Sequence, residues 1–125
     1  MSDWRPVPPQ APASEGMVDV GGCRLWYWDT GGAGEAVVLL HAGSQSGAGW
    51  GYQQPAFAEA GFRVIGYSRR GCWRSEAGDR AAPGMAAEDL RRLLDHCGIA
   101  QAHLVAVALG AFYALDFALL HPQRL

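Results

Sequence analysis

One stretch of the chain has the residue types and spacing of a catalytic turn. Residues 103–112 read His-Leu-Val-Ala-Val-Ala-Leu-Gly-Ala-Phe, an apolar run followed by a small residue, a glycine and a helical pattern. This order predicts a strand, a sharp turn and a helix, with the layout small-x-nucleophile-x-Gly that holds one side chain above the edge of a sheet. The residue at the tip is Ala108, which has no nucleophilic atom. The sequence therefore predicts the place of a reaction without its nucleophile.

The elements that must position this turn alternate between strand and helix. Two short strand patterns flank Gly21-Gly22 and predict a hairpin, because glycine accepts the positive φ angles of a tight primed turn. An alternating pattern of strands and helices predicts an α/β fold with a mainly parallel sheet, helices on both faces and an initial β-hairpin. The hairpin strands are expected over residues 17–20 and 23–29, the later strands over 36–40, 62–67 and 104–107, and the helices over 50–60, 87–97 and 111–120.

The composition excludes several classes of protein. The net charge is −2, and the ten basic residues, all arginine, form no long run, so neither a nucleic acid nor a membrane surface is expected as a partner. No apolar stretch approaches the roughly 20 residues of a membrane span. The N-terminus has neither the basic nor the apolar region of a signal peptide. Three widely spaced cysteines without a CxxC motif indicate reduced thiols, a cytoplasmic location and no metal site.

The length of 125 residues fits one small domain, and half of the residues are hydrophobic, enough for a core. Residues 1–16 contain four prolines and few residues that could anchor them, so we interpret this segment as a flexible tail. Residues 17–125 are then the folded part of the chain.

Four segments, in this order, resemble the α/β-hydrolase family over residues 17–125. They correspond to the strand before the oxyanion loop, the strand before an Asp-x-Arg-Gly-x-Gly-x-Ser loop, the helix and strand leading into the nucleophile elbow, and the end of the next helix. The matching residues are 37–41 with Gly43, 61–67 with Arg70, Gly71 and Ser75, 87–105, and 121–124. The chain departs from the family pattern at Ala42, Ser68, Trp73 and Ala108.

The resemblance implies an enzyme without a cofactor that acts on an ester, amide, lactone or activated C–C bond of a small-molecule substrate. By position, the oxyanion donors are the backbone N–H groups of Leu109 and Gly43, or of Ser44 if the loop is shifted. We expect the pocket to be lined by His41, Ser46 and Trp50. The family's general base and acid follow later strands, beyond Leu125, so this chain alone is expected to be inactive.

The alanine at position 108 leaves three interpretations open. The elbow residue adopts a strained conformation with positive φ, so a site that had drifted from catalysis would have no reason to avoid glycine. Alanine is also the substitution that experimenters make for a catalytic serine to trap a substrate. The first interpretation is therefore a serine hydrolase in an inactive form. The second is a natural enzyme without this nucleophile, such as a cofactor-free lyase or an oxygenase-like member, and the third is a non-catalytic binding protein.

Other polar residues are expected to have structural roles. The arginines at positions 69, 70 and 74 could bind an anionic substrate. The favoured interpretation is that Arg70 hydrogen-bonds within the protein, whereas Arg69 and Arg74 are solvated. We also expect structural roles for the histidines at positions 41, 103 and 121.

The end of the matched region predicts a surface that needs a partner. The helix over residues 111–120 is apolar almost all round, and it lies beside the equally apolar strand over 104–107. Alone, this pair would expose an unpaired strand edge and an apolar patch. We expect residues 17–125 to be the N-terminal portion of a domain with an incomplete core. It would pair with the remainder of its own chain, a complementary fragment or a second copy.

Overall fold

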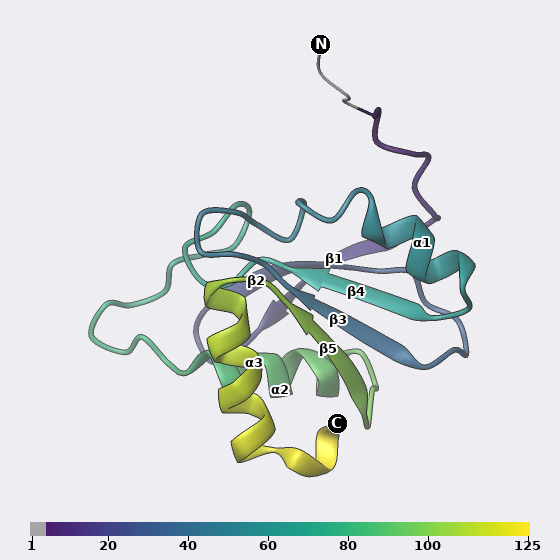
Figure 1. Ribbon diagram of the computed structural model, residues 1–125. Helices are drawn as coiled ribbons and strands as arrows, with labels where there is room; N and C mark the ends of the chain where they lie inside the picture. The colour runs from purple at the N-terminus through teal and green to yellow at the C-terminus, as the bar shows by residue number, and fades with distance from the viewer. Residues whose placement is uncertain (1–4) are drawn as a thin grey trace.

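The structure, a computed structural model, describes residues 5–125. Strands and helices alternate after an initial hairpin, in the order that the sequence predicts (Figure 1). The strands are β1 (Ser14–Asp19), β2 (Arg24–Asp29), β3 (Ala36–Leu40), β4 (Arg63–Tyr67) and β5 (Ala102–Ala106). The helices are α1 (Gln53–Glu59), α2 (Ala86–His96) and α3 (Leu109–Leu120), followed by the short 3-10 helix η1 (Pro122–Arg124).

The strands form one sheet in the order β1-β2-β4-β3-β5. β3 pairs in parallel with both β4 and β5, whereas β2 is antiparallel to both β1 and β4. The α/β fold class is confirmed, with a mixed sheet whose parallel part is β4-β3-β5. Leu40 lies opposite Tyr67 on one side and Ala106 on the other, so the three parallel strands end at the same edge of the sheet. The loops that follow them must meet there.

Helices cover both faces of the sheet, with α1 on one face and α2 and α3 on the other (Figure 1). The alternation of side chains along β3 explains this arrangement. Val37 and Leu39 pack in a cluster with three tryptophans and Phe57 of α1. Val38 and Leu40 belong to the larger cluster that includes the buried leucines of α2 and Phe117 of α3. Since β3 is buried on both faces, its sequence is a continuous apolar run.

The hairpin turn is confirmed at Gly21 and Gly22, which have φ values of 102° and 81°. The Asp19 carboxylate accepts hydrogen bonds from both N–H groups, at 2.8 and 3.0 Å, and these bonds lower the pKa of Asp19. β1 begins three residues earlier than predicted, because Ser14 still pairs with Asp29 at the far end of β2. The first strand therefore includes the last residues of the segment interpreted as a tail.

The remainder of that segment makes contacts as far as it is described. The backbone N–H and carbonyl of Ala11 both hydrogen-bond to the Gln54 side chain of α1, at 2.9 and 2.8 Å. Residues 1–4 lie outside the described residues.

The outer face of α3 is apolar and exposed. Phe112, Leu115 and Leu119 have exposed fractions of 69%, 63% and 81%. Next to this face, β5 lies at the edge of the sheet and pairs with β3 alone. The strand edge and the apolar patch that the sequence predicts are therefore both present in the described residues. None of the helices in that part of the chain has the length and apolarity needed to cross a membrane.

Candidate functional site

Ala108 lies at the tip of a tight turn between β5 and α3. Its backbone has φ 52° and ψ −123°, a conformation that residues other than glycine rarely adopt. The Gly110 N–H donates to the Val107 carbonyl at 3.0 Å, and the Ala111 N–H donates to the Ala108 carbonyl at 2.9 Å, which closes the turn. Ala108 itself is exposed. The predicted strand, turn and helix are thus present, with the positive φ of a nucleophile elbow.

The loop after β3 lies against the first residue of α3. The Val107 N–H donates to the Leu40 carbonyl at 3.2 Å, and a Cβ on Gly43 would lie 3.1 Å from Cδ2 of Leu109. In the described part of the chain, no acceptor is found for the backbone N–H groups of Gly43, Ser44 and Leu109. These groups belong to two exposed loop residues and the first residue of a helix, where N–H groups have no partner within the helix. These three N–H groups are therefore left without an acceptor in the described residues.

Gly47 holds the loop after β3 in place. Its carbonyl accepts a hydrogen bond from Trp28 Nε1 at 2.8 Å, and its N–H donates to Ser68 Oγ at 3.0 Å. A Cβ at position 47 would lie 2.6 Å from the Tyr67 carbonyl carbon, so only glycine fits without a shift. Ser68, which departs from the family pattern, therefore positions the loop through its hydroxyl group.

His41 is fully buried at the start of the same loop. Its Nε2 accepts a hydrogen bond from the Arg69 N–H at 3.1 Å, and its Nδ1 lies 2.6 Å from the Ala42 carbonyl. An acceptor at Nε2 and a carbonyl at Nδ1 together require the neutral tautomer protonated at Nδ1. Burial lowers the pKa of His41, which agrees with this neutral form. Both ring nitrogens are engaged, so His41 connects the loop after β3 with the loop after β4.

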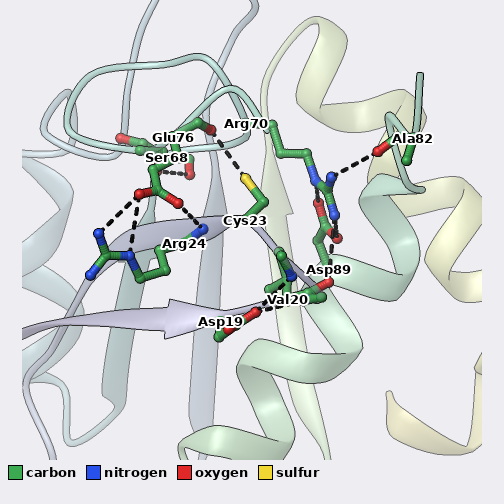
Figure 2. Close-up of polar contacts among 12 residues, drawn as sticks. Asp19, Val20, Cys23, Arg24, Ser68, Arg70, Glu76, Ala82 and Asp89 are labelled. Atoms are coloured by element: carbon green, nitrogen blue, oxygen red, sulfur yellow. Dashed lines mark hydrogen bonds and ion pairs between the residues drawn. The ribbon is translucent and has the colours of Figure 1, made fainter. Parts of the chain in front are cut away.

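Arg70 anchors the loop after β4 to α2. Its guanidinium forms two hydrogen bonds with the Asp89 carboxylate, at 2.8 and 3.0 Å, and both side chains are largely buried (Figure 2). The pairing raises the pKa of Arg70. Further along the loop, Glu76 binds the exposed Arg24 side chain at 3.0 Å and accepts from Cys23 Sγ through its carbonyl at 3.3 Å (Figure 2). The expected structural role of Arg70 is confirmed.

The residues expected to line one pocket are divided among separate cavities. Gly43 and Leu109 line a cavity of about 340 Å³ together with Arg69 and Tyr113. Ser44 and Ser46 line a second, shallow cavity with Trp73. Trp50 lines a third, of about 310 Å³, with Trp26 and Trp28. The structure thus brings Gly43 and Leu109 together at the elbow, while Ser46 and Trp50 lie elsewhere.

The expectation that Arg69 is solvated is wrong, since its side chain is buried and the residue is only 8% exposed. Its guanidinium lies over the ring of Tyr113, 5.0 Å from the ring centre. A charged residue in a polar loop gives no sequence signal of burial. The position of Arg69 depends on the hydrogen bond from its N–H group to His41 and on the packing of Tyr113 of α3 against its side chain.

The remaining histidines of the described residues are occupied away from the elbow. His96 on α2 contacts the Tyr27 hydroxyl at 3.0 Å, His103 on β5 contacts Glu35 at 2.9 Å, and His121 at the end of α3 contacts Glu88 at 2.6 Å. In residues 5–125, no group of three His, Cys, Asp or Glu side chains is arranged to hold a metal ion.

Known proteins are similar to this chain over most of its length. A family model described as alpha/beta hydrolase fold matches residues 35–125. A 2-hydroxy-6-oxononadienedioate/2-hydroxy-6-oxononatrienedioate hydrolase from Burkholderia vietnamiensis is 39% identical, over 81% of this chain and 37% of that protein. A 2-hydroxy-6-oxo-6-phenylhexa-2,4-dienoate hydrolase from Comamonas testosteroni is 36% identical over the same shares.

Solved structures agree with these similarities. The crystal structure of epoxide hydrolase A from Mycobacterium thermoresistibile superposes with a TM-score of 0.83 at 31% identity, covering 91% of this chain and 37% of that one. The chain therefore spans little more than a third of the length of the proteins that it matches.

Proposed function

Since the chain belongs to the α/β-hydrolase fold family, we propose that it forms the part of a hydrolase that carries the nucleophile elbow and the oxyanion loop. Ala108 occupies the position of the nucleophile. The substrate is a small molecule with an ester, amide, lactone or activated C–C bond. The relatives named as hydrolases of 2-hydroxy-6-oxo dienoic acids support this choice, since they are similar over 81% of the chain.

The observation that carries this proposal is the geometry of the turn. Ala108 has φ 52°, and a residue without function there could relieve the strain by becoming glycine. Leu109, at the start of α3, and Gly43, in the loop after β3, line one cavity, and their N–H groups are the donors that we propose for the oxyanion. A carbonyl carbon placed beside residue 108 would direct its oxygen toward these donors. Such donors stabilise the oxyanion of an acyl-transfer transition state.

Binding of the oxyanion by backbone N–H groups does not depend on the side chain at position 108. Replacing serine by alanine removes one oxygen and keeps the N–H groups that bind the oxyanion. Such a protein retains only the catalysis due to binding and the oxyanion hole, on the order of 10³–10⁴-fold over water in serine proteases. We place the general base outside residues 5–125, because the histidines of that region make other contacts. We place the acid there as well, as the resemblance to the family implies.

The side chain at position 108 provides the test. We expect Ala108→Ser, in the complete protein, to gain turnover of small aryl acetates, while Ala108→Gly stays inactive. The glycine variant is the matched control, since it changes the same backbone position without adding an oxygen. If Ala108→Ser gains no turnover and a histidine outside this segment is essential for another reaction, the protein is a nucleophile-free lyase or oxygenase-like enzyme. If neither change matters for ligand affinity, it is a binding protein.

The apolar face of α3 and the free edge of β5 need a covering element, and we propose that further polypeptide of the same hydrolase domain covers them. A parallel strand beside β5 would pair its free backbone groups, and a following helix would cover Leu115 and Leu119. We expect the 125-residue segment alone to self-associate. A stable monomer of 13.4 kDa in size-exclusion chromatography would contradict this expectation.

A further inference from the structure

Arg69 is a buried cation beside the elbow. It follows β4 by two residues and is 8% exposed. It lines the same cavity of about 340 Å³ as Gly43 and Leu109, the residues that carry the proposed oxyanion donors. We call this cavity, lined by Gly43, Arg69 and Leu109 among others, the elbow cavity. Arg69 can contact a ligand bound in it.

Among the described residues, no hydrogen-bond acceptor is found for the guanidinium of Arg69. Its Nη1 is buried without a hydrogen-bond partner in the described residues. Its Nη2 lies 3.2 Å from Nδ1 of His41, but that nitrogen carries the proton donated to the Ala42 carbonyl. Two donors thus face each other, and this contact cannot satisfy the guanidinium.

In the part of the chain that the structure describes, no carboxylate forms an ion pair with Arg69. Within residues 5–125 the ion pairs of arginine involve other positions, among them the neighbouring Arg70 with Asp89 (Figure 2). Asp89 also lines the elbow cavity, but both of its oxygens accept from Arg70. The ring of Tyr113 lies 5.0 Å from the guanidinium and supplies a cation–π contact. That contact attracts the cation but supplies no hydrogen-bond acceptor for its N–H groups.

A second polar group near Arg69 is also unpaired. Tyr67 is 1% exposed, and its hydroxyl has no hydrogen-bond partner in the described part of the chain. Burial raises the pKa of Tyr67, and the positive charge of Arg69 partly opposes that rise. In the described residues, Nη1 of Arg69 and the Tyr67 hydroxyl, which can donate or accept, are therefore both without a partner.

We propose that Arg69 binds a carboxylate of the substrate, so that the elbow cavity selects small monocarboxylic acids that carry the reacting carbonyl group. A guanidinium donates two parallel N–H bonds to the two oxygens of a carboxylate. A single unpaired arginine balances the one negative charge of a carboxylate better than the two charges of a phosphate dianion. Because Arg69 and Leu109 line one cavity, the carboxylate and the reacting carbonyl would be bound by the same molecule. The presence of a reacting carbonyl group in the ligand rests on the proposed function. The binding of a carboxylate rests on Arg69 alone.

The protein as it exists, with Ala108, is suited to a binding test because it has no nucleophile at position 108. Isothermal titration would compare benzoate and hexanoate with benzamide and hexanamide, which have the same shape without the charge. We expect each acid to bind about tenfold or more tightly than its amide, as for hydrogen bonds to a charged group. This preference should be lost in Arg69→Met and kept in the control Arg74→Met, whose side chain is exposed.

Thermal unfolding gives a second measurement that does not need a ligand. Removal of an unpaired buried charge should raise the midpoint of Arg69→Met, whereas Arg70→Met should lower it because Asp89 loses its partner. Equal binding of acids and amides, binding of inorganic phosphate as tight as that of the acids, or a lowered midpoint for Arg69→Met would overturn the proposal.

The outcome can be separated from that of the proposed function. Turnover of aryl acetates by Ala108→Ser without a preference for acids would contradict the role of Arg69 and leave the hydrolase intact. A preference for acids that depends on Arg69, without turnover by Ala108→Ser, would contradict the hydrolase and keep the binding site.

Discussion

The carbonyl oxygen of Leu40, at the end of β3, accepts a hydrogen bond at 3.2 Å from the N–H of Val107, at the start of the elbow. This bond joins the two loops that carry the proposed oxyanion donors. Gly110 approaches the same carbonyl group closely. A Cβ at position 110 would lie only 2.4 Å from the Leu40 oxygen. Gly110, the glycine of the elbow motif, therefore allows α3 to pack closely against the end of β3.

We predict that Gly110→Ala destabilises the protein, although alanine is favoured over glycine within a helix by about 1 kcal/mol. The added methyl group would contact the Leu40 carbonyl at 2.4 Å, and overpacking of this kind costs about 1–3 kcal/mol. Gly49→Ala is the control, since its Cβ would meet a Gln45 side-chain oxygen at 3.2 Å that can move away. Urea unfolding measures both variants. A gain in stability for Gly110→Ala would show that α3 does not approach β3 so closely.

Ala108→Gly should stabilise the fold. The residue has φ 52°, and removal of its Cβ relieves strain of about 1–3 kcal/mol, less the larger entropy that glycine adds to the unfolded chain. We expect the free energy of unfolding to rise by about 1 kcal/mol in urea titrations. The control Ala111→Gly, three residues later in α3, should lower it by about 0.5–1 kcal/mol. Equal losses in the two variants would rule out a strained elbow.

The ion pair between Arg70 and Asp89 should contribute far more to stability than the pair between Arg24 and Glu76. The first pair has side-chain exposures of 15% and 7%, the second 62% and 44%. Arg70→Met would leave the Asp89 carboxylate buried without a partner, a loss of about 3–5 kcal/mol. Arg24→Met removes a solvated contact and should have a much smaller effect. Denaturant titrations of the two variants would refute this ranking if the losses were similar.

His41 should make stability fall as the pH falls. The buried ring stays neutral in the folded protein because burial lowers its pKa, while the unfolded chain binds a proton at this residue below about its usual value of 6.5. The unfolded state then binds more protons, so the free energy of unfolding decreases as the pH drops below that value. We predict that His41→Asn flattens this dependence between neutral pH and the onset of carboxylate titration.

His103→Asn is the control for the pH experiment, since His103 is exposed on β5. It should keep the slope of the wild type. Slopes that are equal in both variants would assign the pH dependence to another group.

The elements with a strong local pattern were predictable. The apolar run of β3, the Gly21-Gly22 turn and the elbow around Ala108 were placed from the sequence, because each depends on neighbouring residues. The start of β1 was missed, since Ser14 joins the sheet only through its partner Asp29 on the next strand.

The cavities were harder to predict than the fold. Gly43 and Leu109 meet because two parallel strands end in register, which the α/β pattern implies. Ser46 and Trp50 follow in the same loop, but Gly47 binds the loop to Ser68 and Trp28 and directs them to other cavities. The burial of Arg69 depends on contacts with His41 and Tyr113, which are distant in the sequence. No local pattern could reveal it.

The most direct test of the account is the crystal structure of the Ala108→Ser variant of the complete protein after reaction with an aryl phosphonate ester. The phosphonyl group on the introduced serine would mimic the tetrahedral intermediate, with one oxygen in the oxyanion position. We predict that this oxygen lies about 2.7–3.1 Å from the backbone nitrogens of Leu109 and of either Gly43 or Ser44. A phosphonyl oxygen directed to solvent, with these N–H groups unpaired, or the absence of any adduct on the introduced serine, would contradict the account.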